Sequence, residues 1–113
     1  MKQEILIANA FSLNMLNPGS QAGNQPRIPR PCPDPKGLIA EANFLGYEIR
    51  SVVGHADTAN VLGTILGREV AMNRETVILQ PHQTLLVGQY SGPRLPEGAT
   101  ELPEGATITW WEM

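Results

Sequence analysis

Apolar and β-branched residues are grouped along the chain in short runs that predict several strands. Residues 4–11 (EILIANAF) are apolar without polar alternation, which predicts a central strand covered on both faces. Residues 76–80 (TVILQ) and 84–90 (TLLVGQY) flank Pro81-His82-Gln83, and this arrangement predicts a β-hairpin. A last strand is expected over residues 106–112 (ATITWWE).

Two further segments carry helical or ambiguous patterns. Residues 57–66 repeat apolar side chains at helical spacing, with Asp57 as the expected N-cap and Gly67 as the residue that ends the helix. Residues 37–44 (GLIAEANF) fit a strand or a helix, and we favour a strand because Gly46 closes the run. Strands combined with at least one packed helix predict a small mixed α/β sheet flanked by helices.

Proline and glycine mark the irregular parts of the chain. Residues 17–37 contain six prolines, which remove amide donors and fix φ, so this segment is expected to be a loop. Loops of this length are uncommon in small domains. The segment is either a solvated excursion or a source of cations for a bound anion. The sequence LPEGAT occurs at 95–100 and again at 102–107, and two copies predict two successive turns.

Length and composition indicate one soluble domain spanning residues 1–113. The hydrophobic fraction is 42% and the charged fraction 17%, as in globular proteins. A net charge of −3 argues against binding of long nucleic acid but leaves room for a compact anion held by a few arginines. The single cysteine excludes an internal disulfide, and the apolar run near the N-terminus is too short to span a membrane. We therefore expect a cytoplasmic protein without membrane contact.

Common catalytic motifs are absent from the sequence. It has no CxxC, HExxH, P-loop or GxSxG pattern, so no metal site and no cofactor are expected. Phosphate chemistry without a metal can use the 2′-hydroxyl of RNA as its nucleophile. The protein then supplies a proton donor for the leaving oxygen and cations for the developing charge.

Three residues stand out as candidates for that chemistry. His55 precedes the helix expected near Asp57, where backbone amides favour phosphate. Arg94 and Glu97 lie in a proline-bracketed turn that can hold both side chains in place. The alternatives are structural: a capping or buried His55, and a surface ion pair between Arg94 and Glu97. His82, in the expected hairpin turn, is interpreted as solvent-exposed.

Four blocks in order along the chain carry a family resemblance: ANAFSLNML (8–16), GHADT (54–58), NRE (73–75) and GPRLPEGATELPEG (92–105). They resemble the viral type III anti-CRISPR ring nucleases and their bacterial relatives. The resemblance implies a small α/β homodimer that binds cyclic tetra-adenylate, the second messenger of type III CRISPR defence. It also implies metal-independent cleavage to linear adenylates with 2′,3′-cyclic phosphate ends, which switches the signal off.

The resemblance assigns roles residue by residue. The catalytic histidine and acidic residue of the family fall on His55 and Glu97. The residues assigned to substrate binding are Asn9, Ser12, Asn14, Arg74, Gln89 and Arg94, where Gln89 matches only if one residue is inserted. The proline-rich segment departs from the archaeal viral members.

A homodimer fits this interpretation because a cyclic tetraphosphate lies naturally on a two-fold axis and meets two equivalent sites. Two other interpretations stay open. In the first, the chain is a module that sequesters cyclic oligoadenylate without cutting it. In the second, it is an interaction protein that uses the proline-rich loop as its contact surface.

Overall fold

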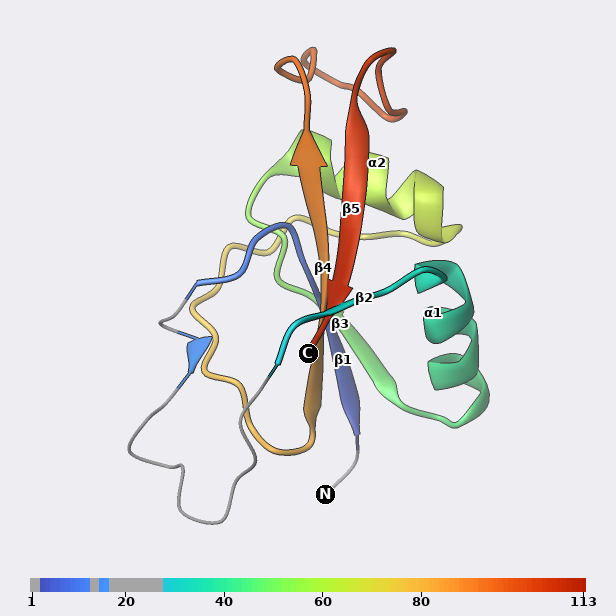
Figure 1. Ribbon diagram of the computed structural model, residues 1–113, viewed down its shortest axis with the longest axis vertical. Helices are drawn as coiled ribbons and strands as arrows, with labels where there is room; N and C mark the ends of the chain where they lie inside the picture. Colours follow the sequence, from blue (N-terminus) through green and yellow to red (C-terminus); the bar gives the residue numbers. More distant parts are fainter. Residues whose placement is uncertain (1–2, 13–14, 17–27) are drawn as a thin grey trace.

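One mixed sheet organises the structure, a computed structural model that describes residues 3–12, 15–16 and 28–113 (Figure 1). The described part holds five strands in the order β2-β5-β4-β1-β3. Strand β1 runs parallel to β3 and β4, whereas β5 is antiparallel to β4 and β2. The bounds are β1 Glu4–Ala8, β2 Arg30–Pro31, β3 Glu48–Ser51, β4 Gln83–Ser91 and β5 Thr107–Glu112. The mixed α/β class, the interior position of the first strand and the final strand are confirmed.

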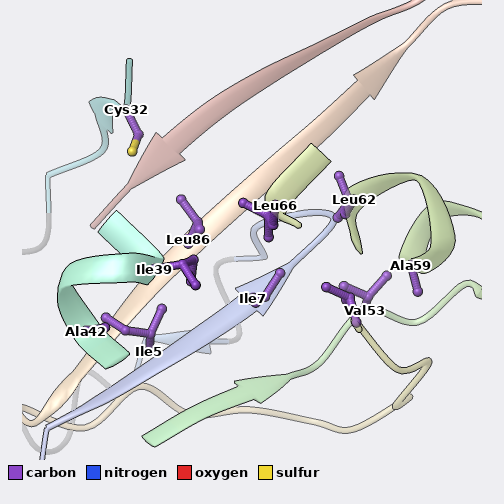
Figure 2. Packing of buried hydrophobic residues seen from close by; sticks show 11 residues of the cluster. Ile5, Ile7, Cys32, Ile39, Ala42, Val53, Ala59, Leu62, Leu66 and Leu86 are labelled. Atoms are coloured by element: carbon purple, nitrogen blue, oxygen red, sulfur yellow. The ribbon is translucent and has the colours of Figure 1, made fainter. Parts of the chain in front are cut away.

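Both helices of the described residues cover the same face of the sheet (Figure 1). They are α1, Pro35–Phe44, and α2, Ala56–Leu66. Figure 2 shows Ile5, Ile7 and Leu86 of the sheet packed with buried side chains of these helices. Because successive strand residues point to opposite faces, Leu6 and Ala8 join a second buried cluster on the other face. Strand β1 is thus covered on both sides, as its unbroken apolar run predicts.

The expected strand over residues 37–44 is wrong, because this segment belongs to α1. The Asp34 side chain caps the helix by accepting a hydrogen bond from the Gly37 amide at 3.0 Å. Pro35 starts the helix, where a missing amide hydrogen costs nothing. Ile39 and Ala42, one helical turn apart, face the core.

The end of the expected proline-rich loop also needs correction. Residues 17–27 lie outside the described part of the chain, but Arg30 and Pro31 form β2 at the edge of the sheet. An edge strand tolerates proline because only one of its sides needs amide donors. Within the range of the expected loop, residues 30–31 thus form a short strand, and residues 35–37 already belong to α1.

The expected hairpin between residues 76–80 and 84–90 is also wrong. Strand β4 exists, but it pairs with β1 and β5, and residues 76–80 form no strand. Val77 and Leu79 alternate with exposed neighbours because they cover the second face of the sheet as an irregular segment. The Leu79 amide donates to the Met15 carbonyl at 2.7 Å instead of to a ladder partner.

The two predicted LPEGAT turns are confirmed. In the first turn the Ala99 amide donates to the Pro96 carbonyl, and in the second the Ala106 amide donates to the Pro103 carbonyl, both at 3.1 Å. The glycines within them have φ of 78° (Gly98) and 83° (Gly105). A positive φ at the third position is the requirement of a type II turn, which explains the repeated glycine.

Candidate functional site

Helix α2 begins beside His55, one residue earlier than predicted. His55 itself is the N-cap residue, with extended backbone (φ −141°, ψ 127°), and its side chain makes no capping hydrogen bond. The prediction of Asp57 as N-cap is therefore wrong, because Asp57 lies in the first turn. The helix ends at Gly67 in the left-handed conformation, as predicted.

An open pocket of about 660 Å³ lies at this end of α2. The start of the helix contributes His55, Asp57 and Thr58, and strand β4 contributes Tyr90. The loop after β4 supplies the rest of the lining: Arg94, Leu95, Pro96 and Glu97. The fold thus brings together three sequence candidates from two distant segments, His55, Arg94 and Glu97.

Hydrogen bonds tie the loop that carries Arg94 and Glu97 to its surroundings. The Tyr90 hydroxyl donates to the Pro93 carbonyl, just before Arg94. The Gly98 amide, just after Glu97, donates to Asp57 Oδ1 at 3.1 Å. Further along, the Thr64 hydroxyl of α2 donates to the Thr100 carbonyl at 2.6 Å. The loop is therefore attached to α2 at two points and to β4 at one.

Gly54, the residue before His55, is held from both sides. Its amide donates to Asn9 Oδ1 at 3.3 Å, and its carbonyl accepts from Arg74 Nε and Nη2 at 3.2 and 3.1 Å. A guanidinium has five N–H donors, so Arg74 keeps others for a ligand. Asn9 and Arg74 are thus placed at the backbone that leads into His55.

Residues on each side of Arg74 are anchored to strand β3. Asn73 Nδ2 donates to the Ser51 carbonyl at 2.9 Å, and Glu75 Oε1 accepts from Arg50 Nη1 at 2.6 Å. The hydrogen bond from Arg50 lowers the pKa of Glu75, and the same bond raises the pKa of Arg50. These contacts hold the Arg74 segment against the edge of the sheet.

Gln89 and Ser12 are not among the described residues that line the pocket. Gln89 is exposed and, by the alternation of β4, points to the face opposite Tyr90. Ser12 is exposed beyond the end of β1, and Asn14 lies outside the described residues. His82 precedes β4 whereas the pocket follows it, so this histidine lies at the other end of the strand.

Asp57 and Tyr90 are pocket residues that the sequence did not single out for function. Asp57 was assigned to helix capping, and only its position two residues after His55 in GHADT pointed to the site. Tyr90 shares the helix-covered face with Leu86 by strand alternation. In residues 3–12, 15–16 and 28–113, no group of three His, Cys, Asp or Glu residues is placed to hold a metal ion.

Most of this chain matches one known protein family. Residues 36–108 match the STIV B116-like family. The chain belongs to that family. The matched range contains the whole pocket, from His55 to Glu97. No curated protein sequence matches the chain significantly.

A solved structure is similar to this B116-like chain over nearly its whole length. It is B116 of Sulfolobus turreted icosahedral virus, with 22% sequence identity and a TM-score of 0.72. The similarity covers 96% of this chain and 97% of the viral protein. At that identity the likeness establishes a common fold. None of the helices in the described ranges is long and apolar enough to cross a membrane.

Proposed function

We propose that this B116-like protein is a metal-independent ring nuclease that cleaves cyclic tetra-adenylate to linear adenylates with 2′,3′-cyclic phosphate ends. The observation that carries the proposal is the meeting of His55, Arg94 and Glu97 in one pocket. Metal-free RNA cleavage requires a proton donor and a cation, and a carboxylate is one of the groups that can accept the proton of the 2′-hydroxyl.

The reaction uses the ligand's own 2′-hydroxyl as the nucleophile. The 2′-oxygen bonds to phosphorus, and the bond from phosphorus to the 5′-oxygen breaks. His55 gives a proton to the departing 5′-oxygen, because histidine is the side chain that titrates nearest neutral pH. Glu97 either accepts the proton of the 2′-hydroxyl or orients His55. Arg94, Arg74 and the first amides of α2 offset the phosphate charge.

A homodimer completes the proposal. Pockets of about 300–1,000 Å³ enclose drug-sized ligands, and a ring of four nucleotides is larger. One pocket of about 660 Å³ therefore takes part of the ring, and a two-fold axis through the ligand supplies a second pocket and doubles the arginines.

Incubation of the purified protein with cyclic tri-, tetra- and hexa-adenylate in EDTA, followed by mass spectrometry, tests the proposal. Cyclic tetra-adenylate should give products with 2′,3′-cyclic phosphate ends. His55→Ala should bind the ligand and lose about 10²–10⁴-fold in single-turnover rate, the usual contribution of general acid catalysis. The matched control is His82→Ala, which should cleave at the wild-type rate.

The alternative outcomes are distinct. Tight binding of the intact ring with no product indicates a sequestering module. Products with only 5′-phosphate ends indicate attack by water and reject the mechanism. Sedimentation of a monomer that cleaves at full rate rejects the dimer.

Arg94 provides a separate test of binding. Arg94→Ala should weaken binding of cyclic tetra-adenylate by about 1.5–3 kcal/mol, the contribution of a charge-assisted hydrogen bond. The matched control is Arg30→Ala, which removes an exposed arginine at the opposite end of β5. Equal affinities of these variants in a titration would remove Arg94 from the site.

A further inference from the structure

Asp57 joins the two halves of the pocket. It lies two residues after His55 in the first turn of α2, and its Oδ1 accepts from the Gly98 amide at 3.1 Å. Gly98 directly follows Glu97 in the chain. A single side chain thus connects the backbone that presents His55 to the turn that presents Glu97.

The turn needs such a connection because it lies in a long irregular segment. No helix or strand occurs between the end of β4 at Ser91 and the start of β5 at Thr107. Within this segment, the Tyr90 hydroxyl holds Pro93 and the Thr64 hydroxyl holds Thr100. The Ala99–Pro96 hydrogen bond closes the turn around Glu97 internally, whereas the Asp57 bond ties a direct neighbour of Glu97 to α2.

The negative charge of Asp57 is unfavourable for binding a phosphate ligand in this pocket. It lines the pocket that the proposed function fills with phosphate, where a second negative charge weakens anion binding. A negative side chain in the first turn also stabilises the helix, but by only about 0.3–1 kcal/mol. The hydrogen bond that Asp57 accepts from the Gly98 amide gives a reason for an aspartate at this position despite its negative charge.

We propose that Asp57 is a positioning residue that sets Glu97 against His55, an inference that rests on the proposed ring-nuclease function. Asp57 acts through the turn and does not touch the reacting atoms. Removing it releases the Glu97 turn from the first turn of α2, while Asn9 and Arg74 still hold the backbone that leads into His55.

The first test compares Asp57→Ala with Asp57→Asn and with Asn60→Ala, an exposed position on the same helix. Asp57→Ala should reduce the single-turnover rate by about 10–10²-fold, because small misplacements of a catalytic group have effects of that size. Asp57→Asn keeps an acceptor oxygen for Gly98 and should recover most of the rate. It should also bind the ligand at least as tightly as the wild type, because it removes a like charge.

A double-mutant cycle shows whether Asp57 acts through Glu97. In a Glu97→Ala background, Asp57→Ala should cause no further loss of rate, because the group it positions is already gone. Multiplicative losses would overturn the proposal, since they would mean that Asp57 acts independently of Glu97. Equal losses in Asp57→Ala and Asn60→Ala would do the same by indicating a general helix effect.

A measurement without substrate keeps the inference separate from the proposed function. In the wild type, the NMR order parameter of the Gly98 amide should lie near the rigid value of about 0.85, and in Asp57→Ala it should fall towards about 0.6. Asp57→Asn should restore it. An order parameter that is the same in wild type and Asp57→Ala overturns the positioning role. If the order parameter falls in Asp57→Ala and recovers in Asp57→Asn, but neither the wild type nor any variant cleaves the ligand, only the ring-nuclease proposal is refuted.

Discussion

Gly88 of strand β4 lies against Leu62 of helix α2, and its replacement by alanine tests how tightly the helix packs. A Cβ at this position would lie 2.8 Å from Leu62 Cδ2 and 2.8 Å from Trp110 Cζ3. Leu62 is fully buried in α2, and Trp110 packs against the same core. The methyl group of Gly88→Ala therefore enters space that is already filled.

The expected cost follows from two opposing effects. Inserting a methyl group into a well-packed core costs about 1–3 kcal/mol. Removing a glycine from the middle of a strand returns about 0.5–1 kcal/mol by reducing the freedom of the unfolded chain. The difference between the two ranges is about 0–2.5 kcal/mol, and the middle of each range predicts that the free energy of unfolding falls by about 1 kcal/mol.

Urea unfolding monitored by tryptophan fluorescence and circular dichroism measures this change. The matched control is Gly54→Ala, whose Cβ would lie 3.7 Å from Arg74 Cγ, an ordinary contact. That variant should unfold at the same urea concentration as the wild type or at a slightly higher one. Its free energy of unfolding should rise by at most about 1 kcal/mol. If Gly88→Ala is as stable as Gly54→Ala, the helix and sheet are not packed as closely as described.

Three further predictions concern stability. Asp34→Ala removes the cap from α1 and should lower the free energy of unfolding by about 0.5–2 kcal/mol in urea titrations. The hydrogen bond from Arg50 lowers the pKa of Glu75 in the folded protein. The ionised Glu75 therefore stabilises the fold above the ordinary glutamate pKa of about 4.3, and this stabilisation is lost as pH falls through the lowered pKa of the folded state. Glu75→Gln should remove this part of the acid dependence of the urea midpoint, and an unchanged dependence would contradict it. Burial raises the pKa of the Cys32 thiol from 9.0, so stability is full below that pH and falls as pH rises above it. Cys32→Ala should lose less stability than the wild type between neutral and alkaline pH.

Several features of this protein follow from local sequence alone. The unbroken apolar run of β1 predicted an interior strand, because only a strand covered on both faces excludes polar residues from both. Gly67 predicted the end of α2, and the LPEGAT copies predicted two turns. In these cases the side chain itself restricts φ or selects a face, so no distant partner is needed.

Other features were decided by tertiary contacts. Residues 37–44 fit both a strand and a helix. The Asp34 cap is a local contact that favours the helix, and the packing of Ile39 against the sheet is the tertiary contact that selected it. Val77 and Leu79 alternate like a strand, yet β1 and β5 already occupy both edges of β4. A short apolar pattern records which residues are buried but not which backbone groups pair with them, so the pairing stays open until the sheet is assembled.

In the candidate site, too, local sequence decided some features and tertiary structure decided others. Residue types and family resemblance singled out His55, Arg94 and Glu97 from the sequence, but their common pocket depends on the packing of α2 against β4 and on the loop that follows β4. Asp57 shows the difference most clearly, because its position before a helix predicted a cap, whereas the folded chain brings Gly98 to it from 41 residues away. Local sequence sets which backbone conformations and burial patterns are favourable. Only the folded chain sets which distant groups meet, because those contacts depend on the path of every segment between them.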